Sequence, residues 1–140
     1  MKLIQSAAAA LAIGLMAAPA MAQNYPTHPI KIVSPFPPGS GIDIIARALA
    51  DKLTPAMGQP VVVENRPGAG GTIGNAAVAN ASPDGYTVLI TSSSITAAPS
   101  LYKSLSYDTM KDLIPVAPLA VLPNILVIAP NNDKGIKTVQ

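Results

Sequence analysis

The amino-acid sequence predicts an α/β fold with a mostly parallel sheet. Three short segments rich in β-branched residues, at 30–33, 61–63 and 87–90, alternate with segments of helical periodicity. This alternation is typical of parallel strands, because each parallel pair needs a crossover connection between its strands. The composition fits one globular domain, with 140 residues of which 49% are hydrophobic and 11% charged.

The first residues predict a signal peptide over 1–22. Lys2 provides a positive start, residues 7–18 are apolar, and Pro19 interrupts the run before the small-x-small site Ala20-Met21-Ala22. Such a pattern indicates export with cleavage after Ala22. A transmembrane anchor is the alternative, but the proline and the alanine-rich composition argue against it. We therefore expect an exported chain that does not insert into the membrane after cleavage.

The segment 30–33 is predicted to form the first strand and to lead through a proline-rich loop into a helix. Ser40 followed by Asp43 fits a capping box at the start of that helix. Pro55 and Gly58 are expected to end it. Its buried stripe is given by apolar residues at three- and four-residue spacing, namely Ile42, Ile45, Ala46, Leu49 and Leu53.

The second strand is expected at 61–63, where three valines predict burial on both faces. The glycine-rich turn 65–71 then leads into a helix over 72–81. A dinucleotide fingerprint is the alternative for these glycines, but their spacing is one residue too long. A tight turn and close packing of the helix on the sheet explain them better.

The third strand is expected at 87–90, after a Pro-Asp-Gly turn. The region 95–112 is predicted to be irregular, with short helical turns near Leu101 and Met110. No internal repeat is present outside the leader.

Several classes of function are excluded by composition. The chain has no cysteine, which removes disulfides, zinc fingers and thiol catalysis. It has one histidine, His28, and scattered carboxylates, so no metal site is expected. A net charge of +2 without a basic cluster predicts no nucleic-acid partner. Ser40 lies in Gly-Ser-Gly rather than in G-x-S-x-G, so we expect no catalytic residues, no enzyme and no cofactor.

The best candidate for a binding site lies at the carboxyl ends of the strands, where open α/β sheets bind ligands. The loops 35–42 and 91–95 follow two of these ends. A helix begins in the first loop, and its amide groups and dipole favour an anion. Three consecutive serines in the second loop add hydroxyl groups. A structural turn with an ordinary helix cap remains the alternative. Asp43 likewise either completes the cap or binds an ammonium or hydroxyl group of a ligand.

Several segments, in this order, resemble one known family. They are PFPPGSGIDIIAR at 35–47, GQPVVVENRPGAGG at 58–71 and PDGYT at 83–87, flanked by 25–30 and 101–112. In these motifs the chain resembles the substrate-binding proteins of tripartite tricarboxylate transporters, also called Bug receptors. The resemblance covers nearly the whole chain after the leader.

The resemblance implies a periplasmic receptor of Venus-flytrap form, whose two α/β lobes close on a small carboxylate and deliver it to a membrane permease. Residues 23–115 would form a first-lobe segment and 116–140 the crossover and the start of the second lobe. The first lobe's share of the ligand site would comprise Phe36, Gly39, Ser40, Gly41, Ile42, Asp43, Ser92, Ser93 and Ser94.

Family members are longer than this chain, so the resemblance implies a lobe that is incomplete here. The folded product is expected to be a monomer. One alternative is a truncated fragment that binds nothing and associates through an open sheet edge. A less favoured alternative is an exported serine hydrolase that uses Ser40.

Overall fold

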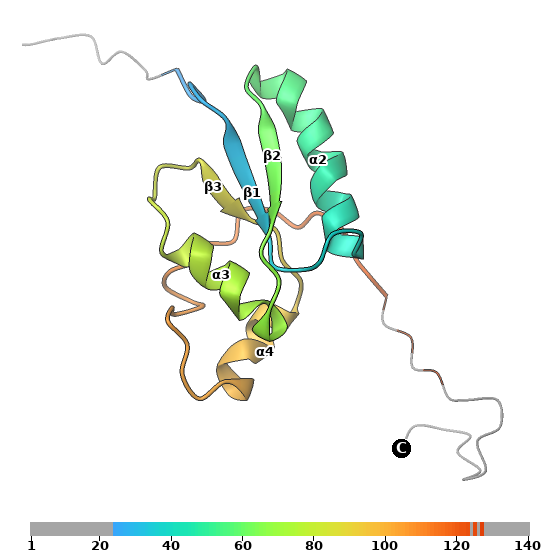
Figure 1. Ribbon diagram of the computed structural model, residues 1–140, viewed down its shortest axis with the longest axis vertical. Helices are drawn as coiled ribbons and strands as arrows, with labels where there is room; N and C mark the ends of the chain where they lie inside the picture. The colour runs from blue at the N-terminus through green and yellow to red at the C-terminus, as the bar shows by residue number, and fades with distance from the viewer. Residues whose placement is uncertain (1–23, 124, 126, 128–140) are drawn as a thin grey trace, which may run out of the picture.

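The computed structural model describes residues 24–123, 125 and 127. The predicted signal peptide, 1–22, lies outside this part, as does most of the predicted segment 116–140 beyond residue 123. The elements are β1 (Ile30–Ser34), α2 (Gly41–Met57), β2 (Val61–Asn65), the 3-10 turn η1 (Ala69–Gly71), α3 (Thr72–Ala79), β3 (Thr87–Leu89) and α4 (Ser94–Leu101). Their alternation confirms the predicted α/β class (Figure 1).

The three strands form a parallel sheet in the order β2-β1-β3. The central strand, β1, aligns Ile32 with Val63 of β2 and Val33 with Leu89 of β3. The connection from β1 to β2 moves to the strand on one side of β1. The connection from β2 to β3 moves back across β1 to its other side. Because such crossovers are right-handed, α2 and α3 lie on opposite faces of the sheet.

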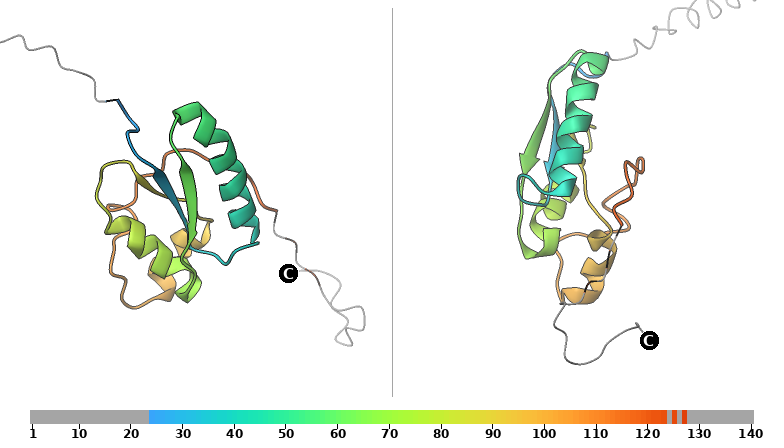
Figure 2. Two further views of the ribbon diagram at one scale, coloured as in Figure 1. Left: turned by 45° about the horizontal axis from the view of Figure 1, so that its top comes forward. Right: turned by 90° about the vertical axis from the view of Figure 1, so that its right-hand side faces the viewer.

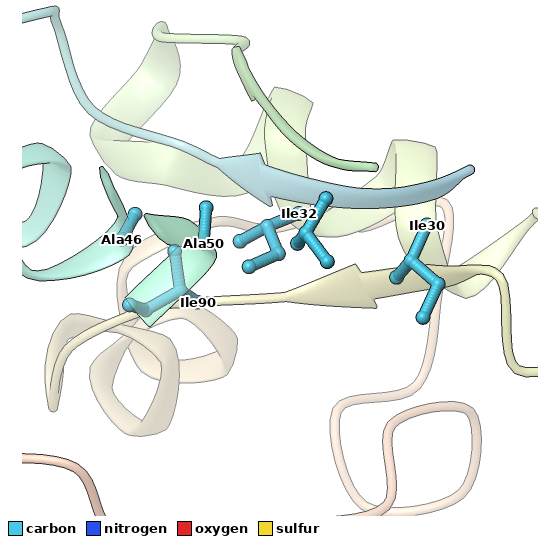
Figure 3. Packing of buried hydrophobic residues seen from close by; sticks show 6 residues of the cluster. Ile30, Ile32, Ala46, Ala50 and Ile90 are labelled. Carbon is cyan, nitrogen blue, oxygen red and sulfur yellow. The ribbon is translucent and has the colours of Figure 1, made fainter. Parts of the chain in front are cut away.

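The core lies between the sheet and α2. Its buried members come from β1, β2, α2 and the residue after β3, and they are Ile30, Ile32, Ala46, Ala50, Val61 and Ile90. Figure 3 shows Ile32 and Ile90 near the two alanines, with Ile30 at the other end of the cluster. The small alanine side chains let α2 approach the strands closely, which explains the helical stripe seen in the sequence.

Helix α2 begins as predicted, with Ser40 as its N-cap. Pro55 does not end it, because the helix runs to Met57 with Pro55 inside its last turn. At that position the proline removes only one hydrogen bond, close to the helix end. Gly58 provides the true stop, since its φ of 68° is left-handed and its N–H donates to the Thr54 carbonyl at 3.1 Å.

The predicted burial of β2 on both faces is wrong. Val62 is 53% exposed, because β2 lies at the edge of the described sheet and α3 does not cover this part of it. The same face carries an ion pair between Lys31 and Glu64 at 2.9 Å. Arg66 also pairs with Glu64.

The helical turn predicted near Leu101 is part of a longer helix, α4, which begins at Ser94 and makes the first part of the predicted irregular region regular. At its start, Ile95 N–H donates to the Ser92 carbonyl at 3.2 Å, and both the N–H and the hydroxyl of Thr96 donate to the Ser93 carbonyl, at 3.1 Å and 2.7 Å. The predicted turn near Met110 is confirmed, since Asp112 N–H donates to the Asp108 carbonyl at 2.9 Å.

Residues 113–123 form neither helix nor strand and leave apolar side chains exposed, including Ile114, Val116 and Val121. Within the described ranges, the helices are too short or too polar to cross a bilayer.

Candidate functional site

The two predicted site loops lie at the same end of the molecule. Residue 35 follows β1 and residue 90 follows β3, and these neighbouring strands stay paired to their ends, with Ile90 N–H donating to the Val33 carbonyl at 3.0 Å. Both views in Figure 2 place α4, which follows the second loop, beyond the carboxyl ends of the strands. The sheet therefore brings the loops 35–40 and 91–94 to one edge, as the sequence predicts.

The first loop ends in a helix start that leaves amide groups available. Ser40 N–H donates to the Pro37 carbonyl at 3.2 Å, and Ile44 N–H donates to the Ser40 carbonyl at 3.0 Å. The intervening amides, of Gly41 and Ile42, have no partner in the part of the chain that the structure describes. At the positive end of a 17-residue helix, two amides that no described residue bonds form an environment that favours an anion.

Asp43 lies behind this helix start and is almost fully buried, with 2% exposure. Its carboxylate accepts four hydrogen bonds: from Gly39 N–H at 2.8 Å, Arg47 Nε and Nη2 at 3.0 Å each, and Asn65 Nδ2 at 2.7 Å. These donors hold the pKa of Asp43 far below its usual range, and Arg47 has the largest effect. The carboxylate is therefore charged and fully paired within the chain.

The predicted capping box is half confirmed. Asp43 N–H donates to the Ser40 hydroxyl at 3.3 Å, as a capping box requires. The return bond reaches Gly39 N–H instead of Ser40 N–H. Gly39 has a left-handed φ of 80°, which brings its N–H toward the Asp43 side chain and gives the glycine its role here.

Two residues of this network, Arg47 and Asn65, were missed in the sequence analysis. Arg47 reaches Asp43 from one turn further along α2, and its Nη2 also donates to Asn65 Oδ1 at 3.1 Å. Asn65 ends β2 and donates to the Phe36 carbonyl at 3.1 Å. The available signals were the four-residue spacing of Asp43 and Arg47 and the place of Asn65 at a strand's carboxyl end.

The second loop is shaped by local bonds. The hydroxyls of Ser92 and Ser94 lie 3.0 Å apart, and Ser94 N–H donates weakly to the Ser92 hydroxyl at 3.4 Å. Ser93 is exposed. Just before them, the Thr91 hydroxyl oxygen is buried and lacks a partner among the described residues. This loop thus offers hydroxyl groups, which can rotate to donate or accept.

A third loop, 66–71, follows β2 and confirms the structural interpretation of the glycines. Gly68, Gly70 and Gly71 all have positive φ angles. A Cβ on Gly74, in α3, would lie 2.7 Å from Pro35 Cβ and 2.9 Å from the Arg66 carbonyl. The glycine therefore lets α3 pack directly on the start of the first site loop.

The site has no metal-binding group of side chains within the described ranges. Two open surface hollows, of about 320 and 440 Å³, lie along residues 104–110 and are lined by neither site loop.

Comparison with known proteins gives the chain its family. Residues 45–140 match the model of the tripartite tricarboxylate transporter family receptors. The protein BugT of Bordetella pertussis is 48% identical over 117 residues, which cover 82% of this chain and 36% of BugT. Across the curated relatives that it matches, the chain spans 30% to 41% of their length.

Solved structures agree with this assignment. The periplasmic binding protein BugD is 46% identical with a TM-score of 0.61, over 63% of this chain and 29% of BugD. MatC of Rhodopseudomonas palustris with bound malate is 36% identical, with a TM-score of 0.62, over 68% and 33% of the two chains. R. palustris Rpa4515 with adipate is 37% identical, with a TM-score of 0.58, over 61% and 29%. The parallel sheet with its flanking helices is therefore a lobe of periplasmic-binding-protein type, and the chain belongs to the tripartite tricarboxylate transporter receptor family.

Proposed function

We propose that this chain provides one side of the ligand site of a periplasmic receptor for a small carboxylate, which the receptor delivers to a tripartite tricarboxylate-type permease. Relatives of this family are transport receptors, not enzymes, and two structural neighbours hold malate and adipate. The proposal assigns the chain a binding role as a monomer, without catalytic residues or cofactor.

One observation carries the proposal: the amides of Gly41 and Ile42, which have no partner among the described residues, lie at a helix start on the same sheet edge as a loop of serine hydroxyls. A carboxylate needs several donors, and these groups supply them without a lysine or arginine. The negative charge of Asp43 is paired with Arg47, so Asp43 repels an incoming anion less than an unpaired carboxylate would.

In this proposal, residues from both loops contact the ligand at the edge of the sheet. The first loop contributes Phe36, Gly39, Ser40, Gly41 and Ile42, and the second contributes Ser92, Ser93 and Ser94. Asp43 shapes the first loop instead of contacting the ligand, because all its donors come from the chain itself.

Malate and adipate provide the direct test of binding. The full gene product, purified from the periplasm, is melted with each dicarboxylate and with dimethyl adipate, which has the same chain but no charge. At a ligand concentration one hundred times Kd, binding stabilises the folded state by about 2.7 kcal/mol. A higher melting temperature with the diacids but not with the ester supports the proposal.

The alternatives predict different melting results. A folded protein whose melting temperature stays constant across a broad panel of carboxylates contradicts the receptor proposal. Concentration-dependent association without any ligand effect supports a fragment that binds nothing, for which the exposed Val116 and Val121 provide a surface.

The intact mass of the periplasmic product tests the export half of the proposal. We expect the mature chain to begin at Gln23, after cleavage at Ala22. A product that retains residues 1–22 contradicts this. Unchanged hydrolysis of model esters on Ser40→Ala substitution would remove the serine hydrolase alternative.

A further inference from the structure

We infer that Asn65 is a positioning residue of the carboxylate site, an inference that rests on the proposed function. Its side chain joins three parts of the first loop's support: it donates to the Phe36 carbonyl and to Asp43, and it accepts from Arg47. It contacts none of the amides or hydroxyls assigned to the ligand, so it acts through the shape of the loop.

The place of Asn65 is fixed by the sheet. It pairs in register with Ser34, the last residue of β1, and the next residue confirms the alignment, since Arg66 N–H donates to the Ser34 carbonyl at 2.8 Å. The side chain therefore starts from a rigid point close to the beginning of the loop. The two hydrogens of its amide are both used, at 3.1 Å and 2.7 Å.

The loop needs such a support because of its own sequence. Pro35, Pro37 and Pro38 have no N–H group, so the loop can form few backbone hydrogen bonds. The Phe36 carbonyl accepts from Asn65 instead. This bond keeps the partially negative Phe36 oxygen turned toward Asn65. The oxygen therefore does not oppose a carboxylate at the helix start.

Asparagine is the residue type that this position requires. Asp43 Oδ1 accepts from Asn65 Nδ2, and a carboxylate at position 65 would replace this donor with a second negative charge. It would also compete with Asp43 for Arg47, which contacts both residues now.

The first test compares Asn65→Ala with Asn80→Ala in the full gene product. Asn80, the residue after α3, is a matched control, because it is exposed and its side chain bonds only to the Ala76 carbonyl within the described part of the chain. We expect Asn65→Ala to weaken malate and adipate binding about tenfold and to speed hydrogen exchange of the Gly39 amide about as much. Asn80→Ala should change neither quantity.

Two results of this test overturn the inference. If Asn65→Ala lowers the melting temperature but leaves affinity unchanged, the role of Asn65 is purely structural. If Gly39 exchange is unchanged, Asn65 does not hold the loop. Failure of the proposed function gives a different result, because the unsubstituted protein then binds neither diacid. That result also contradicts the inference.

The second variant, Asn65→Asp, keeps the size of the side chain and tests the charge argument even if Asn65→Ala does not fold. Relative to the unsubstituted protein at each pH, we expect its affinity deficit to shrink as pH is lowered from about 7.5 to about 5.5, because protonation restores a donor and removes the repulsion. A deficit that is constant over this range contradicts the inference.

Discussion

The two site loops lie side by side at one edge of the sheet but are held in different ways. The first loop is fixed by side chains that come from distant parts of the chain, with Asn65 bonded to Phe36 across 29 positions and to Asp43 across 22. The second loop is held by bonds between residues two or three positions apart, such as Ser92 with Ser94. One loop depends on the tertiary fold, whereas the other depends on its own helix start.

This difference suits two roles at the proposed carboxylate site. Fixed amides give a carboxylate a pre-formed set of donors, which lowers the entropy lost on binding. Hydroxyls that rotate can adapt to whatever group lies beside that carboxylate. We therefore expect the first loop to control the strength of binding and the second to control the choice among carboxylates.

The largest expected effect is on the support of the first loop. Gly74→Ala places a methyl group within 3 Å of Pro35 and the Arg66 carbonyl, so the backbone must move. We expect a loss of about 3 kcal/mol in unfolding free energy. Urea denaturation measures it, with Gly58→Ala as the control. That site has open space but a left-handed φ, so its loss should be about 1 kcal/mol. Equal losses would contradict the close approach.

The next effect is the pH dependence due to Asp43. Its lowered pKa stabilises the folded state above the unfolded pKa of about 3.9, and this contribution is lost as pH falls through the lower folded value. Asp43→Asn should therefore be less stable than the unsubstituted protein at neutral pH. The gap should narrow only below about pH 4. Urea midpoints between neutral pH and strong acid measure the gap, and a gap that closes near pH 6 would contradict the assignment.

A smaller effect separates the two loops directly. Ser40→Ala removes the N-cap of α2 and should cost about 1 kcal/mol, measured by thermal or urea unfolding. Ser93→Ala is the control in the second loop. Ser93 is exposed and its side chain does not cap α4, so its removal should leave stability unchanged. Similar losses at both positions would mean that the loops are held alike.

The smallest effect has the opposite sign. Thr91→Val replaces a buried hydroxyl that has no partner in the described part of the chain by a methyl group of the same shape. Stability should stay the same or rise by up to about 1 kcal/mol. A clear loss in thermal unfolding would show that the hydroxyl is bonded in the folded protein, and the second loop would then be less adaptable than proposed.

The features predicted correctly from the sequence are those encoded within a few residues. The valine- and isoleucine-rich runs, the stripe of α2 and the Ser40 cap depend on local periodicity and local hydrogen bonds. The exposure of Val62 was missed because burial depends on the order of the strands, which no single strand contains. Only a short turn near Leu101 was predicted where α4 forms, because Pro99 and a run of serines hide the full eight-residue helix.

The same reasoning explains the site. The meeting of the two candidate loops at one edge was predicted correctly, because parallel strands bring their carboxyl ends together, a rule that needs only the strand positions. Asn65 and Arg47 were not found, because their partners lie on other elements and become neighbours only in the folded sheet. The placement of Asp43 at a helix start was correct, but its burial was not foreseen.

The strand order β2-β1-β3 has a consequence for the time course of synthesis. The strand made first, β1, is the central one, and its second partner, β3, begins 57 residues after it. Until Thr87–Leu89 has left the ribosome, one edge of β1 has no native strand to pair with. Early products of synthesis therefore cannot complete the sheet on both sides of its central strand, which delays folding.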